Sequence, residues 1–314
     1  MNPSHINRYT LPVIAALALA GCAGSQVAPT GGAMIAGHAA HGKSWMLPEA
    51  KHEDLIYAVG GCGGTCVLSY PQGKLVGELT GVDGGADCSD SNGNVFISEQ
   101  TAVVEFAHGG TTPIATYDTP ETPPLGCSVD PESGSLAVVN GEDIAVFPAG
   151  SRNPTNYATM LNAQYCGYDN NGNLFVDGFN GQGVGLSELP KGSSSFEKLS
   201  FDQTYGDPGQ LQWDGEYLSY ENQGKGRPAI SQFTVSGSST KIVGQTVLKG
   251  ASSLRLSWIY EGSVVAPYSV SGPHATLIGI WKYPKGGVPT KRIKQFGDFD
   301  RKTFDFSAVT ISVK

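Results

Sequence analysis

The sequence has few charged residues, and its net charge is negative. The first feature disfavours helical proteins, and the second disfavours nucleic-acid-binding proteins. Asp, Glu, Lys and Arg together make up 15% of the 314 residues, against about 25% in an average globular protein. Because exposed helices are rich in Glu, Lys and Arg, this composition disfavours a helical fold. The formal net charge is -8, whereas nucleic-acid-binding proteins need a basic surface. We therefore expect no nucleic-acid partner.

The chain also lacks, near its start, an apolar run long enough to span a bilayer. The apolar segment at residues 11–20 is shorter than the roughly 20 residues of a transmembrane helix, and its length is typical of a signal-peptide core. It ends in Leu19-Ala20-Gly21-Cys22, which resembles the lipobox of bacterial lipoproteins. The resemblance implies cleavage before Cys22 and acylation of that cysteine, palmitate included. The alternative is an ordinary signal peptide in which Cys22 stands by chance.

This pattern predicts three parts: a lipoprotein signal peptide at 1–21, a flexible tether at 22–49 and a folded domain at 50–314. The tether is mostly Ala, Gly, Ser, Thr and His, and such a segment cannot bury enough apolar surface to fold. His38, His41 and His52 lie in or beside it, but scattered histidines are typical of a polar linker, and we predict no metal site. We expect a lipid-anchored protein of the bacterial cell envelope, at the periplasmic or outer-membrane face.

Glycine is abundant, with 43 residues, and it recurs in a motif. A bulky residue, a turn and a glycine return in SYPQG, EFAHG, VFPAG, ELPKG, QFTVSG and KYPKG. The bulky residues are 36, 41, 42, 44 and 50 residues apart: Tyr70, Phe106, Phe147, Leu189, Phe233 and Tyr283. A period of 40–45 residues is typical of propeller blades, each a four-stranded antiparallel sheet. The sequence therefore predicts an all-β, six-bladed β-propeller.

The order of segments within a repeat assigns the strands. An inner strand such as LGCSVD is followed by a polar turn and a second strand, and the third strand ends in the glycine motif. Proline presets the first central turn position and glycine accepts positive φ, so the motif predicts the turn between the third and fourth strands. The first repeat lacks an inner strand, and we expect the C-terminal strand, at about 303–312, to supply it. The chain thus resembles the NHL-repeat and virginiamycin B lyase-like propellers of exported bacterial lipoproteins.

This strand order predicts two different faces. The turn face carries the first-to-second and third-to-fourth turns, and the loop face carries the second-to-third loops and the blade-to-blade connections. The loop face has the longer and more variable segments, where binding residues usually lie. Asp118, Tyr205 and Asp207 fall near the predicted site. Its main candidates are Phe179, Asn180, Glu221, Arg227, Tyr268 and His274.

Cysteine is the sharpest local feature. Cys88, Cys127 and Cys166 are 39 residues apart, so they occupy the same position in three successive blades, whereas Cys62 and Cys66 lie in the second-to-third loop of the first blade. Thiols tend to pair outside the cytoplasm. Cys62–Cys66, Cys88–Cys127 and Cys127–Cys166 are all candidate disulfides, and the alternatives are buried free thiols or a three-thiolate metal site. Besides Cys22 the count is odd, so at least one cysteine stays free or pairs between chains.

Motifs for catalysis are scarce. We find no nucleophile elbow, no zinc-peptidase motif and no convergent acid–base set, and we expect no cofactor. The leading hypothesis is a membrane-tethered monomeric propeller that binds an unknown protein or small molecule. One alternative is an enzyme similar to virginiamycin B lyase, with a metal-assisted site on the loop face that would need carboxylates and a histidine base. Another is a scaffold for an envelope complex.

Overall fold

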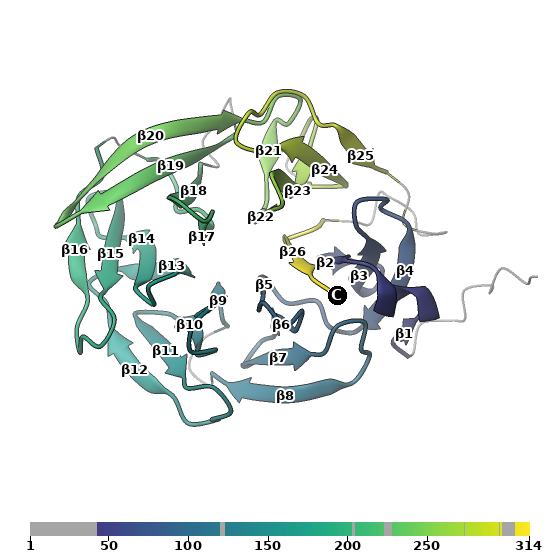
Figure 1. Ribbon diagram of the computed structural model, residues 1–314, viewed down its shortest axis with the longest axis horizontal. Helices are drawn as coiled ribbons and strands as arrows, with labels where there is room; N and C mark the ends of the chain where they lie inside the picture. Colours follow the sequence, from purple (N-terminus) through teal and green to yellow (C-terminus); the bar gives the residue numbers. More distant parts are fainter. Residues whose placement is uncertain are drawn as a thin grey trace, which may run out of the picture. The chain divides into compact units, whose positions relative to one another are not determined.

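The computed structural model describes residues 43–119, 123–202, 205–222, 228–272, 274–294, 296 and 305–314. They belong to one compact unit, residues 40–314, and form six antiparallel sheets arranged in a ring (Figure 1). The prediction of a six-bladed β-propeller is confirmed. Cys22, Arg227 and most of the predicted tether lie outside the described residues. No helix among the residues described is long and apolar enough to cross a membrane.

Blades 1 to 3 follow the chain from its start. Blade 1 contains, from its outer edge to the ring centre, β1 (Trp45–Met46), β4 (Leu75–Thr80), β3 (Gly64–Ser69), β2 (Leu55–Gly61) and β26 (Ala308–Ser312). A short 3-10 helix, η1 (Pro48–His52), links β1 to β2. Blade 2 contains β5 (Asp87–Ser89), β6 (Val95–Ser98), β7 (Ala102–Phe106) and β8 (Pro113–Asp118). Blade 3 contains β9 (Cys127–Val129), β10 (Leu136–Asn140), β11 (Asp143–Phe147) and β12 (Thr155–Ala158).

Blades 4 to 6 repeat the pattern. Blade 4 contains β13 (Asn162–Tyr168), β14 (Leu174–Phe179), β15 (Val184–Leu189) and β16 (Glu197–Leu199). Blade 5 contains β17 (Leu211–Trp213), β18 (Leu218–Asn222), β19 (Ala229–Ser236) and β20 (Ser239–Val247). Blade 6 contains β21 (Ser253–Leu254) and β22 (Trp258–Tyr260), which both pair with β23 (Ser263–Ser269), followed by β24 (Leu277–Lys282) and β25 (Lys291–Ile293).

The two ends of the propeller share one sheet, as the sequence predicted. Strand β26 pairs antiparallel with β2, from Leu55 opposite Ser312 to Val59 opposite Ala308. The predicted start of this strand, at about 303, lies outside the described residues. Pairing the last strand with the first repeat leaves no free sheet edge between the ends, which is how propellers avoid exposed edges.

The ordered sheet begins earlier than the boundary at residue 50 that the sequence suggested. Strand β1 pairs antiparallel with β4 and adds a fifth strand to blade 1. The indole N–H of Trp45 donates a hydrogen bond to Glu78 Oε2 at 3.2 Å. The short strand therefore covers the outer edge of blade 1, and residues 23–44 lie between it and Cys22 in the sequence.

The glycine motif closes the third-to-fourth hairpin, as predicted, and in blades 1 and 6 it also contacts the preceding blade. Gly73 (φ +69°) and Gly286 (φ +67°) both have left-handed backbone. A Cβ atom at Gly73 would lie 2.5 Å from the Ile293 side chain of blade 6, and one at Gly286 would lie 2.5 Å from the Val247 carbonyl of blade 5. In these two blades the motif thus helps to dock neighbouring blades, whereas Gly150, Gly192 and Gly237 have open space around the position of a Cβ atom.

An aspartate follows the inner strand in four blades and shapes the turn face. In blades 2 to 5 its carboxylate accepts a hydrogen bond from the backbone N–H two residues later, at 2.8–3.0 Å. These residues are Asp90, Asp130, Asp169 and Asp214. Such turns are a local alternative to ladder pairing, so the end of the inner strand is fixed by its own sequence in these four blades.

Candidate functional site

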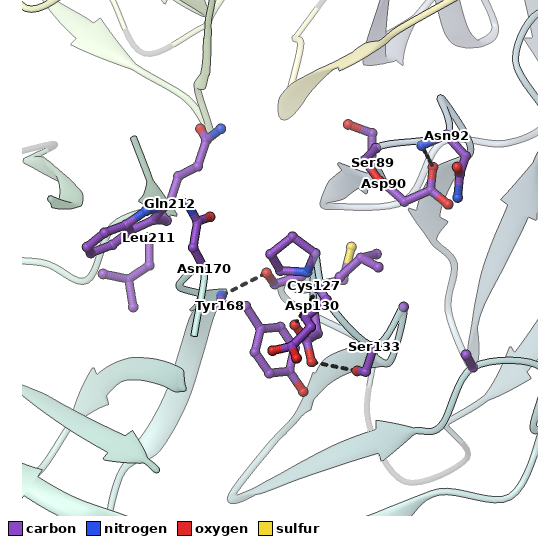
Figure 2. A pocket seen from close by; sticks show the side chains of 18 of the residues that line it. Ser89, Asp90, Asn92, Cys127, Asp130, Ser133, Tyr168, Asn170, Leu211 and Gln212 are labelled. Carbon is purple, nitrogen blue, oxygen red and sulfur yellow. Dashed lines mark hydrogen bonds between the residues drawn. The ribbon is translucent and has the colours of Figure 1, made fainter. Parts of the chain in front are cut away.

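A central pocket of about 500 Å³ lies at the turn face, where the inner strands end. Blades 2 to 5 contribute strand ends and first-to-second turns, and blade 6 contributes Trp258. Figure 2 shows Asp90 and Asn92 on one side, Asn170 and Gln212 on the other, and Cys127 and Asp130 between them. The volume falls within the 300–1,000 Å³ range of small-molecule sites.

Aromatic side chains form a substantial part of the wall. Trp258 packs against the apolar cluster of blades 1 and 6 and also against the cluster of blades 2 and 3, so it bridges from one side of the ring to the other. Tyr168 comes from blade 4, and Trp213 packs against the cluster of blades 4 and 5. The indole Nε1 of Trp213 is buried and has no hydrogen-bond partner among the described residues.

The carboxylates of the pocket are held in place by the turns. Asp90 accepts hydrogen bonds from the backbone N–H groups of Asn92 and Asn94, at 2.9 and 2.8 Å, and Asp130 accepts one from the Ser133 hydroxyl. Glu132 forms an ion pair with Lys191 outside the pocket lining. Among the described residues that line the pocket, none is Lys or Arg.

The other end of the ring centre is closed by an apolar cluster. Ala86, Leu256 and Ala308 come from blades 2, 6 and 1, and Tyr165 of blade 4 packs against them. The backbone N–H of Leu256 donates to the Ser307 carbonyl at 3.2 Å, and that of Val309 donates to the Leu256 carbonyl at 3.1 Å. These residues stand at or before the beginnings of the inner strands, so this cluster closes the ring centre towards the loop face.

Side-chain hydrogen bonds hold blades 5 and 6 together beside the pocket. The Gln212 amide donates to the Ile259 carbonyl at 2.9 Å and accepts from the Ile259 N–H at 2.8 Å. Nearer the loop face, Glu221 accepts a hydrogen bond from the backbone N–H of Ser257 at 2.8 Å. Both side chains thus pair with the backbone of the inner segment of the next blade.

Two aspartates are buried close to the inner strands. Burial raises the pKa of Asp177 well above the ordinary value of 3.8, although its carboxylate accepts hydrogen bonds from Tyr165 N and Gly209 N at 3.0 and 2.8 Å. Burial also raises the pKa of Asp87, against the lowering effect of backbone hydrogen bonds from Thr310 and from Asp87 itself. A perturbed buried acid can mark a functional site, but it can also be structural.

A second cavity, of about 460 Å³, lies between blades 4 and 5 at the turn face. Four carboxylates line it: Asp169, Glu188, Glu197 and Glu216. Glu188 and Glu197 are directly opposite on neighbouring strands, and burial, followed by the charges of Asp169 and Glu197, raises the pKa of Glu188. Within the described part of the chain, no group of three or more His, Cys, Asp or Glu residues is placed to hold a metal ion.

The structure distributes the predicted loop-face candidates over blades 4 to 6. Phe179 ends β14 and is 41% exposed, and Asn180 follows it in the hairpin. Glu221 and Tyr268 belong to strands β18 and β23 rather than to loops, and at 1% and 0% exposure they offer no surface to a ligand. The structure corrects their predicted position in loops: the strands of blades 5 and 6 extend further than their sequences indicated.

The remaining candidates differ in their surroundings. His274 is exposed, and its Nδ1 lies 2.9 Å from Asp305 Oδ2. Arg255 also approaches Asp305, at 3.7 Å, so both His274 and Arg255 lie against the same surface carboxylate. Asp118 is exposed at the end of β8, whereas Tyr205 is buried among aromatic side chains of blade 5.

Cys88, Cys127 and Cys166 lie in the inner strands of blades 2 to 4, as the repeat indicated. Cys88 and Cys127 form a disulfide between the inner strands of blades 2 and 3, with their Cα atoms 5.8 Å apart. Cys62 and Cys66 form another, with Cα atoms 5.3 Å apart; Cys66 lies in β3 rather than in the loop. Cys166 is free and buried, and burial raises the pKa of its thiol. Of the pairings left open, the structure thus contains two.

The central pocket was not predicted, because the sequence analysis placed the binding site among the long variable loops of the loop face. Tyr168 and Trp213 both directly precede the aspartate that follows an inner strand, in YD and WD. This shared repeat position was a usable signal: aromatic residues that recur there must gather where the inner strands meet. Trp258 has no such aspartate after it, and its position depends on how blade 6 closes the ring.

Comparison with solved structures supports the fold. A chain of a nidogen–laminin complex is 12% identical, with a TM-score of 0.64 over 83% of this chain and 98% of that one. A protein of unknown function from Bacteroides caccae is 10% identical, with a TM-score of 0.61 over 83% and 100%. A structure of U3-55K is 9% identical, with a TM-score of 0.53 over 76% of each chain. At such identities the likeness concerns the fold alone. No protein-family model and no curated protein sequence matches the chain.

Proposed function

We propose that this protein is an exported, lipid-anchored binding propeller that holds a ligand in the central pocket of the turn face. The observation that carries the proposal is the pocket itself: five blades wall a space of about 500 Å³ at the ends of the inner strands. The apolar cluster around Leu256 closes the other end of the ring centre. A rigid ring with one pocketed end suits recognition, because the binding groups are already in place before the ligand arrives.

The anchor rests on the sequence around Cys22. The segment from Ala23 to the first described residue, Lys43, leads into the outer edge of blade 1 through β1. A flexible chain of this length has an end-to-end distance of about 25 Å. Such a tether would leave the ring free to turn its pocket towards a soluble ligand or a partner protein near the membrane.

Membrane fractionation tests the anchor. The full chain should label with radioactive palmitate and stay with the membrane fraction, and Cys22→Ser should lose the label and be released in soluble form. The matched control is Cys166→Ser, which removes a thiol from the folded ring. Retention of the unlabelled Cys22→Ser protein on membranes would contradict lipid anchoring.

A thermal-shift screen tests the binding role. The purified chain is heated with individual compounds from a diverse small-molecule library, because a ligand that binds the folded state raises the melting temperature. We expect hits whose effect is reduced by Asn170→Ala at the pocket. If the shift in melting temperature caused by each hit is unchanged by every pocket substitution, the ligand binds outside the pocket, which contradicts the proposed site. No observation among the described residues favours the metal-assisted lyase, which stays a prediction from the sequence.

A further inference from the structure

We infer that the central pocket recognises an uncharged, polyhydroxylated ligand, a short saccharide being the class that fits it. The inference rests on the proposed function and specifies its ligand. Its evidence is the kind, number and rigidity of the groups around the pocket.

Three aromatic residues are among those that line the pocket: Tyr168, Trp213 and Trp258. Trp258 is held between clusters from opposite parts of the ring, and Tyr168 is only 9% exposed. The face of an aromatic ring carries partial negative charge, so it attracts the weakly positive C–H groups on the flat side of a sugar ring. Trp213 adds a third aromatic side chain to the lining, with its indole Nε1 buried.

The polar groups match hydroxyls better than ions. The lining contains the side-chain amides of Asn92, Asn170 and Gln210 beside several serines. An amide both donates and accepts hydrogen bonds, and so does each hydroxyl of a sugar. Asn92 and Asn170 are exposed, and Figure 2 shows them on different sides of the hollow. A ligand with hydroxyls around its rim could therefore bond to several blades at once.

The charges of the pocket argue against an anionic ligand and do not require a cationic one. An anion would meet Asp90, Asp130 and Glu132, with no basic lining residue among those described to offset them. Glu132 pairs with Lys191, which lies outside the lining. The two aspartates are engaged by their own turns, Asp90 by two backbone N–H groups and the Asn94 amide, and Asp130 by the N–H of Glu132 and the Ser133 hydroxyl. Their remaining lone pairs are fixed acceptors for ligand hydroxyls.

Calorimetric titration of the full chain, purified in detergent, tests this inference. The probes are three panels: uncharged mono- and oligosaccharides, organic amines including tetramethylammonium, and inorganic phosphate with small carboxylates. We expect saturable binding of at least one uncharged saccharide and weaker or no binding of the charged panels.

Matched variants locate the binding. Trp258→Leu should weaken the saccharide about fivefold or more, as expected for the loss of one aromatic contact, and Trp258→Phe should restore most of the affinity. Asn170→Ala removes an exposed amide of the pocket and should weaken binding without lowering the melting temperature. Asn180→Ala, on the loop face, should bind like the unmodified chain.

The outcomes separate the inference from the proposed function. Binding of an amine or an anion, sensitive to Trp258→Leu and Asn170→Ala, would overturn the saccharide class and leave a binding propeller. Saccharide binding that is lost in Asn180→Ala but kept in Asn170→Ala would overturn the assignment to this pocket. If no panel binds and the thermal-shift screen also gives no hit at the pocket, both the inference and the proposed binding role fail.

Discussion

At the scale of single residues, the glycines of the hairpin motif can be required for two reasons: a left-handed backbone and close contact with the neighbouring blade. The sequence does not distinguish these reasons. All must accept left-handed backbone, but their surroundings differ. Gly286 has φ +67° and faces the Val247 carbonyl of the neighbouring blade, whereas Gly150 has φ +73° and open space around the position of a Cβ atom.

This pair separates backbone strain from blade contact. Gly150→Ala should lower the free energy of unfolding by about 1–2 kcal/mol, the cost of a non-glycine residue in this conformation. Gly286→Ala adds a clash with backbone atoms, and we expect its loss to exceed that of Gly150→Ala by more than about 1 kcal/mol. Urea denaturation of both variants measures the difference. Equal losses would show that the contact between blades 5 and 6 is easily relaxed.

The buried carboxyl of Asp87 predicts a pH dependence of stability. Because burial raises its pKa in the folded state above 3.8, the folded chain binds this proton more tightly than the unfolded chain does. The stabilisation is fully present below pH 3.8 and is lost as the pH rises through the folded-state pKa. Asp87→Asn cannot titrate, so its melting temperature should improve relative to the unmodified chain as the pH rises from 4 to 8. If the difference in melting temperature between Asp87→Asn and the unmodified chain stays constant from pH 4 to 8, Asp87 does not have a raised pKa in the folded state.

At the scale of elements, the strands and turns could be predicted because their signals are local. The polar turn that follows an inner strand and the glycine of each hairpin both act within a few residues. The repeat then assigned the tail strand to blade 1, since one inner strand was missing there. Strand β1 escaped prediction because its two residues, Trp45 and Met46, carry no periodicity.

The contacts between elements could not be read from the sequence in the same way. Gln212 looks like an ordinary polar residue of an inner strand, but its amide pairs with both backbone groups of Ile259 in the next blade. Likewise, Glu221 and Tyr268 stand beside loop residues in the sequence but inside strands in the structure. The length of a strand depends on its partner strand, which a local pattern does not contain.

The junction between blades 5 and 6 gives a prediction at this scale. Gln212→Leu keeps the approximate size of the side chain but leaves the Ile259 N–H and carbonyl without their partner. We expect a loss of about 1–3 kcal/mol in the free energy of unfolding, the cost of unpaired backbone groups. Gln182→Leu, on an exposed loop of blade 4, is the control and should change stability little. An equal effect of the two substitutions would show that the Gln212 hydrogen bonds do not stabilise the junction between blades 5 and 6.

At the scale of the whole molecule, ring closure decides where a ligand can bind. The six inner strands converge, the cluster around Leu256 closes the ring centre towards the loop face, and the pocket is left at the turn face. The sequence favoured the loop face because variable loops are common binding elements. The pocket depends on side chains from five blades that are far apart along the chain, and only the closed ring shows that they share one space.

A crystallographic fragment screen tests the location of the site most directly. Crystals of the folded ring are soaked with a library that contains sugar-like, amine and acidic fragments, and the bound positions are mapped. We predict that fragments bind in the central pocket, against Trp258 and beside Asn170. Most of the fragments bound there should be uncharged and hydroxylated. Fragments that instead gather around Phe179, Asn180 and His274, with the central pocket empty, would contradict it.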